Sequence, residues 1–147
     1  MAETGFKYIG QKRRVKEDRR FITGRGRFAA DLRLPGTLHV AMVSSPYACA
    51  EILGIDASAA LAMPGVRYVL TGEELFEHIN PLLSGLDLPN VKRVPLARGR
   101  ARYAGEWVAA VVAESRALAE DAAELVEIDY EMLDHVIDPE EAIKPDA

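Results

Sequence analysis

The sequence predicts an α+β fold, and three of its features lead to this class. The apolar run WVAAVVA at 107–113 is typical of a strand that is covered on both faces. Residues 118–126 follow it with the apolar spacing of an amphipathic helix, which Ser115 can cap. Apolar residues then alternate with acids at 126–131, as in a half-buried strand. Because further strand patterns come earlier, we expect a mixed sheet with a C-terminal strand–helix–strand unit.

Shorter elements are expected on both sides of this unit. Asp56 or Ser58 can cap a helical turn, and Thr71 with Glu74 has the spacing of a capping box. Asp138 before a proline is typical of a helix start. In chain order we expect a short helix at 15–22, the start of a strand at 28–32, strands at 37–44, 52–55 and 66–70, a helix at 72–79, an irregular segment at 80–100 and a short helix at the C-terminus.

Composition limits the class of protein. The 147 residues are 49% hydrophobic and 28% charged, which is ordinary for a globular chain. No apolar run reaches the length of a membrane helix, and no apolar leader follows Met1, so we expect a cytoplasmic protein without a membrane span. Cys49 is the sole cysteine, which excludes an internal disulfide and any iron–sulfur site built by this chain.

The net charge of −5 hides an uneven distribution, with basic residues near the N-terminus and acidic residues from Glu114 onward. Residues 1–14 are expected to form an extended basic arm, and residues 15–147 the folded domain. Such an arm can dock on an acidic partner or on the acidic end of its own chain. Nucleic acid is the other option, but the arm lacks interleaved aromatic residues and the protein is acidic overall. We therefore expect no nucleic-acid partner.

Most candidate chemistry in the sequence has a simpler structural explanation. Gly24-Arg25-Gly26 could cradle a phosphate, but a P-loop or Rossmann pattern is missing, so a turn is expected. The three histidines lack metal-ligand spacing. Cys49 has no histidine near it in sequence that could act as its base. Glu106 precedes the buried strand and is expected to be a turn carboxylate that accepts backbone N–H groups, with a functional role as the alternative.

Five segments in a fixed order resemble one known family. They are EDRRFITGRGRF (17–28), LPGTLHVAMVSSPYACAEI (34–52), PGVRYVLTGEEL (64–75), ARYAGEWVAAVVAES (101–115) and AEDAAELVEIDYEMLDHVIDPEEAI (119–143). Together they resemble the N-terminal a/b hammerhead domain of the molybdenum-cofactor subunit in the xanthine oxidase, aldehyde oxidase and carbon monoxide dehydrogenase family. Two positions depart from the family pattern: Cys49 stands where histidine is frequent, and Trp107 where proline is frequent.

The resemblance implies an a/b hammerhead fold and a role in a molybdenum hydroxylase. In that family the large subunit holds molybdopterin or its cytosine dinucleotide, and electrons pass through [2Fe–2S] clusters to FAD. The resemblance therefore implies three partners: a molybdopterin-binding large chain, a [2Fe–2S] subunit and an FAD subunit. Because the family's active-site residues lie in later domains, this chain is expected to bind none of these cofactors and to have no catalytic or metal-binding residues.

Two further expectations concern how the chain works. We expect it to be a natural small subunit of a split enzyme, with an excised domain as the alternative. A stand-alone protein- or nucleic-acid-binding module that uses the basic arm is the competing function, and a small enzyme using Glu106 or Cys49 is a third. The residues most expected at a partner interface are Arg25, Arg27, Tyr103, Gly105, Glu106 and Trp107.

Overall fold

The computed structural model describes residues 15–81 and 94–145. Its contacts separate two compact units, the first ending at Pro35 and the second beginning at Gly36. This division falls inside the domain that was expected to start at residue 15. The predicted arm at 1–14 lies outside the described residues, so its boundary stays a prediction. No helix of the described parts has the length and apolarity to cross a membrane.

The first unit is built from short local elements. Helix α1 (Asp18–Ile22) lies within the range expected for a helix, and its end is marked by Gly24 with a φ of 69°. The strand start expected at 28–32 is wrong, because Ala29–Asp31 form a 3-10 turn. The Phe28 N–H donates to a carboxylate oxygen of Asp31 at 2.9 Å, and this local bond competes with strand pairing.

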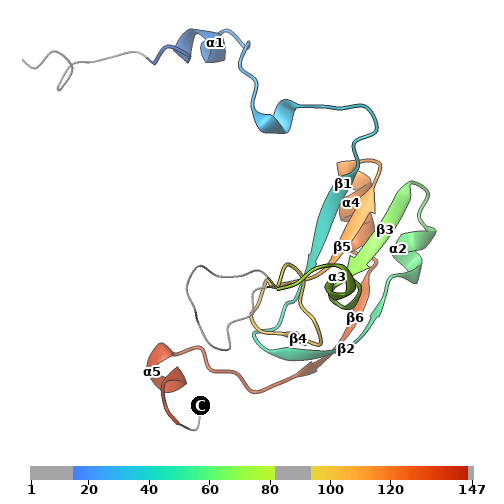
Figure 1. Ribbon diagram of the computed structural model, residues 1–147, viewed down its shortest axis with the longest axis vertical. Coiled ribbons are helices and arrows are strands. Elements are labelled where there is room, and N and C mark those ends of the chain that lie inside the picture. Colours follow the sequence, from blue (N-terminus) through green and yellow to red (C-terminus); the bar gives the residue numbers. More distant parts are fainter. Residues whose placement is uncertain (1–14, 82–93, 146–147) are drawn as a thin grey trace, which may run out of the picture. The chain divides into compact units, whose positions relative to one another are not determined.

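The second unit contains two antiparallel sheets of three strands each (Figure 1). One sheet has the order β1-β5-β3 and the other β4-β2-β6. The elements are β1 (His39–Ser44), β2 (Ala50–Asp56), α2 (Ser58–Ala62), β3 (Val66–Thr71), α3 (Gly72–His78), β4 (Arg100–Ala101), β5 (Trp107–Ala113), α4 (Arg116–Ala123), β6 (Glu127–Met132) and α5 (Pro139–Ala142).

The α+β class and the strand–helix–strand order at the C-terminus are confirmed, but the mixed sheet is corrected. All ladders among the named strands are antiparallel, and α4 leads from β5 in one sheet to β6 in the other. The two strands of the unit therefore do not share a sheet. Apolar alternation fixes which residues face a core, but it does not select the neighbouring strand.

The core lies around β5, the central strand of the first sheet. Val108 and Val111 are its largest fully buried side chains, and α4 covers the sheet with Ala119 and Ala122. This agrees with the continuous apolar run at 107–113. Strand β3 lies at the edge of the sheet, and Val69 is its one buried residue.

Three predicted caps are present. The Thr71 hydroxyl accepts the Glu74 N–H at 3.4 Å, Ser115 accepts that of Leu118 at 3.2 Å, and the Asp138 carboxylate accepts the Glu140 N–H at 2.8 Å. Before α2 the acceptor is Asp56, which bonds the Ser58 N–H at 2.8 Å. The hydrogen bonds from Ser58 hold the pKa of Asp56 below its ordinary value, because they favour the charged carboxylate.

Candidate functional site

A tight turn at 102–106 holds three of the six predicted interface residues, and a fourth, Trp107, follows it directly at the start of β5. Glu106 is 3% exposed, and its carboxylate accepts the Arg102 backbone N–H at 2.6 Å and Nε at 2.9 Å. The Arg102 guanidinium completes the pair through a second nitrogen. This hydrogen bond to Glu106 raises the pKa of Arg102 above its ordinary value. The interpretation of Glu106 as a turn carboxylate that bonds backbone is confirmed, because a buried carboxylate is tolerated only when it is paired in this way.

The turn is also fastened to the end of β1. The Gly105 N–H donates to the Ser45 carbonyl at 2.8 Å, and the Ser45 N–H donates to the Glu106 carbonyl at 2.8 Å. Gly105 has a φ of 88°, a backbone conformation that side chains disfavour. Ser45 is buried, so the attachment is shielded from water. The result is a rigid support for whatever the turn displays.

Two exposed aromatic side chains lie at this point of the chain. Tyr103, in the turn, is 58% exposed, and Trp107, the first residue of β5, is 51% exposed. Tyrosine and tryptophan are the side chains most enriched at the energetic centres of protein interfaces, since they bury a large area at little entropic cost. The Glu106 carboxylate is not free for acid–base chemistry, because both of its oxygens are engaged.

A cavity of about 580 Å³ lies beside the turn. Its walls include Cys49, Tyr103, His135, Val136 and Ile137. Sequence reasoning missed that Cys49 and His135 line the same cavity, because they are far apart in the chain. Antiparallel pairing of β2 with β6 joins them, through the Leu133 N–H that donates to the Cys49 carbonyl at 3.0 Å.

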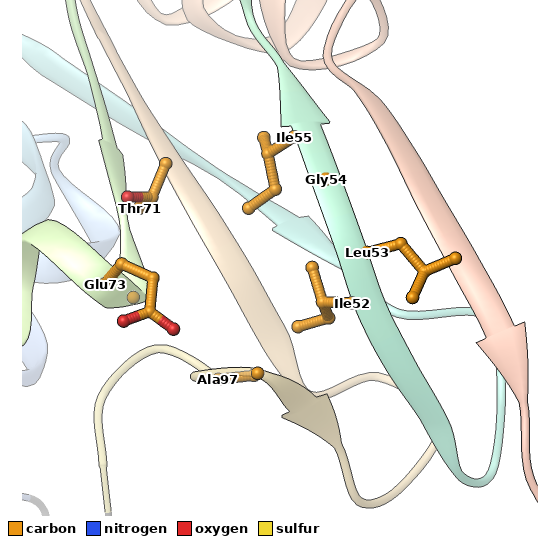
Figure 2. A pocket seen from close by; sticks show the side chains of 9 residues that line it. Ile52, Leu53, Gly54, Ile55, Thr71, Glu73 and Ala97 are labelled. Atoms are coloured by element: carbon orange, nitrogen blue, oxygen red, sulfur yellow. The ribbon is translucent and has the colours of Figure 1, made fainter.

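A second cavity, of about 350 Å³, lies where β2 faces the start of α3 (Figure 2). Figure 2 shows Ile52 and Ile55 pointing from β2 towards Thr71 and Glu73, with Leu53 on the other side of the strand. The wall is closed tightly on one side: a Cβ on Gly72 would lie 1.9 Å from the Ala97 carbonyl oxygen.

The segment that was expected to be irregular, 80–100, lies partly outside the described residues, which omit 82–93.

Among the described residues, the lining of the second cavity does not suit the pyrophosphate of a molybdopterin cofactor. The second cavity offers a Thr71 hydroxyl and a Glu73 carboxylate but no basic side chain, whereas a pyrophosphate needs cationic or N–H donors. A [2Fe–2S] cluster needs four ligands, usually thiolates, and Cys49 is the sole cysteine. In the described ranges, no group of three or more histidine, cysteine or acidic side chains could hold a metal ion.

Arg25 and Arg27, the other two predicted interface residues, belong to the first unit and are exposed. The chain turns at Thr23 and Gly24, and the Phe21 ring lies 2.4 Å from the place where a Gly26 Cβ would stand. The structure therefore groups Tyr103, Gly105, Glu106 and Trp107 in the second unit, and the two arginines in the first.

Comparison with known proteins gives a consistent result. A family model for the a/b hammerhead domain of aldehyde oxidase and xanthine dehydrogenase matches residues 23–134. The chain is 44% identical over 136 residues to the carbon monoxide dehydrogenase large chain of Hydrogenophaga pseudoflava, a match that covers 90% of this chain and 16% of that one. It is 41% identical over 139 residues to the nicotine 6-hydroxylase large subunit of Paenarthrobacter nicotinovorans, covering 92% of this chain and 17% of the relative.

A solved structure agrees with the sequence matches. Quinoline 2-oxidoreductase from Pseudomonas putida 86 superposes with a TM-score of 0.83 at 44% identity, covering 90% of this chain and 17% of that chain. The chain spans about one sixth of the length of the curated relatives it matches. These matches in sequence and in fold show that the chain belongs to the a/b hammerhead domain family of aldehyde oxidases and xanthine dehydrogenases.

Proposed function

We propose that this chain is a structural and assembly component of a molybdenum hydroxylase, supports a molybdopterin-binding partner chain and has no catalytic residue of its own. Molybdopterin or its cytosine dinucleotide is held by that partner, and [2Fe–2S] clusters and FAD by further subunits. The relatives that support this are large chains of which the matched region is about one sixth. We include a cytoplasmic location in the proposal.

The observation that carries the proposal is the exposed apolar surface beside the turn. We call Tyr103, Val136 and Ile137 the turn surface, since all three line the same cavity. Ile137 is 81% exposed, and Val136 and Tyr103 are each about half exposed. Contiguous apolar exposure beside a rigid, internally bonded turn is typical of a surface that another protein covers. Protein docking is therefore favoured over catalysis at this site.

Binding to the partner tests the proposal. The molybdopterin-binding chain of the same source, produced without hammerhead residues, is immobilised and titrated with this chain. The double variant Tyr103→Ser/Ile137→Ser is expected to raise Kd by about a hundredfold or more, because loss of two buried apolar side chains removes about 3 kcal/mol or more. The variant Leu61→Ser, on exposed α2, is the matched control and is expected to bind as the original chain does. Equal binding by all three proteins contradicts the proposed surface.

A further inference from the structure

The first unit lacks a core of its own. No residue at 15–35 is classed as buried, although the segment contains several large apolar side chains. Ile22 is 83% exposed, and Val15, Phe28 and Leu32 are each exposed by more than half. Transferring such side chains from water to an apolar surface is favourable, so a segment of this composition is stable in contact with something else.

Local bonds nevertheless give this segment a defined shape. The Phe21 and Phe28 rings stack with centroids 5.2 Å apart. The Thr23 hydroxyl donates to the Arg19 carbonyl at 2.7 Å, and Phe28 N–H is bonded by Asp31. A binding segment that is already shaped loses less conformational entropy when it docks. Local hydrogen bonds and ring stacking, rather than burial in a core, therefore give this segment a shape that is suited to docking.

The charge of the segment is unbalanced. Residues 15–35 contain six basic and three acidic side chains, which gives a net charge of +3. The acids are engaged locally: Asp18 accepts the Val15 N–H, Asp31 accepts that of Phe28, and Glu17 pairs with Arg20. Within the described parts of the chain, the remaining cations form no ion pair; they are Lys16, Arg19, Arg25, Arg27 and Arg33.

We propose that residues 15–35 are a docking segment that lies on an acidic-rimmed apolar surface of the molybdopterin-binding partner chain. The inference rests on the proposed function and names a second contact for it, separate from the turn surface. Apolar side chains such as Ile22 and Leu32 insert into the surface, while Arg25 and Arg27 pair with carboxylates at its rim. In the relatives, the matched residues belong to chains about six times as long, so the proposed occupant is the part of such a chain that lies outside the match.

Nucleic acid fits this segment less well. Proteins that bind single strands stack bases on open aromatic rings, but Phe21 and Phe28 stack on each other. Binding to phosphates depends on basic side chains, so it does not account for the exposed aliphatic side chains of this segment. The observations therefore favour an acidic protein surface, and nucleic acid becomes an outcome of the test.

The test compares two variants of this chain in titrations of the molybdopterin-binding chain described above. Arg25→Glu/Arg27→Glu reverses two unpaired charges and is expected to raise Kd at least tenfold in 50 mM salt and to flatten its salt dependence. Ile22→Ser/Leu32→Ser is expected to raise Kd similarly at every salt concentration. Arg116→Glu/Lys144→Glu makes the same charge change elsewhere and is expected to stay within threefold of the original chain. Thermal unfolding of each variant checks that the second unit is intact.

Each outcome decides the matter. If the original chain does not bind, both the proposed function and the docking segment fail. If it binds and both docking variants match the charge control, the docking segment alone is wrong. Retardation of a 30-base DNA strand or duplex at the same protein concentration, lost in Arg25→Glu/Arg27→Glu, also overturns the inference, since it assigns the segment to nucleic acid.

Discussion

The Glu106 carboxylate is buried against the backbone N–H and guanidinium of Arg102, four residues earlier in the chain. This pair closes the turn that carries Tyr103 and leads into Trp107 at the start of β5. The buried end of the pair is the carboxylate, while the arginine side chain stays 44% exposed. Glu106 therefore acts on the interface through the shape of the turn.

Replacing Glu106 tests this role. Glu106→Ala removes the buried carboxylate that accepts the Arg102 N–H and pairs with its guanidinium, and we expect the free energy of unfolding to fall by about 1–3 kcal/mol in urea titrations. Glu106→Gln keeps one oxygen acceptor and should lose less. The control Glu77→Ala changes an exposed carboxylate on α3 and is expected to change stability by about 0.5 kcal/mol or less. Equal stability of Glu106→Ala and the control would show that the pair does not hold the turn.

The contact between Gly72 and Ala97 gives a second prediction. A Cβ at Gly72 would lie 1.9 Å from the Ala97 carbonyl oxygen, which is backbone and cannot rotate away. We expect Gly72→Ala to destabilise the chain by about 2 kcal/mol or more, because the strand or the helix start must shift. Gly54→Ala is the matched control, since nothing lies within 4 Å of its added Cβ. It should be neutral or slightly stabilising through the unfolded state. Thermal and urea unfolding of the two variants measure the difference.

Tyr130 gives a prediction of pH dependence. Burial raises the pKa of the Tyr130 phenol, and the nearby Ser45 hydroxyl offsets part of that rise. No hydrogen bond of normal geometry to this hydroxyl is present among the described residues. The folded state holds the phenol proton more tightly than the unfolded state. The contribution of Tyr130 to the free energy of unfolding is therefore fully present below the unfolded pKa of about 10, and it is lost as pH rises through the folded pKa.

The matched variant for this effect is Tyr130→Phe. It removes the ionisable group but keeps the ring that contacts Tyr47 edge to face, with centroids 5.2 Å apart. Urea unfolding from pH 8 to pH 11 should show a steeper loss of stability in the original chain than in Tyr130→Phe. Parallel curves for the two proteins would mean that the Tyr130 phenol does not titrate differently in the folded state.

Local signals in the sequence predicted the elements that depend on local bonds. The apolar run at 107–113 predicted the central strand, and the helix starts at Thr71, Ser115 and Asp138 follow from side chains that accept nearby N–H groups. These features need no knowledge of distant residues. They were therefore accessible from the chain alone.

Features that depend on distant residues were not accessible in the same way. The 3-10 turn after Phe28 replaced an expected strand because Asp31 bonds its N–H, and no strand among the described residues pairs with this segment. The neighbouring positions of Cys49 and His135 depend on which strand pairs with β2, and alternation alone does not choose that strand. Glu106 was placed correctly as a turn carboxylate, but its arginine partner was not anticipated.

The central claim is that the chain supports catalysis by a molybdenum-containing partner without taking part in the chemistry. Its most direct test measures dye reduction by the molybdopterin-binding, iron–sulfur and flavin chains with and without this chain. Turnover is expected to require this chain, to be absent from this chain alone, and to keep its kcat in Cys49→Ser. Full turnover without this chain, or turnover by the isolated chain that is lost in Glu106→Gln, would contradict the account.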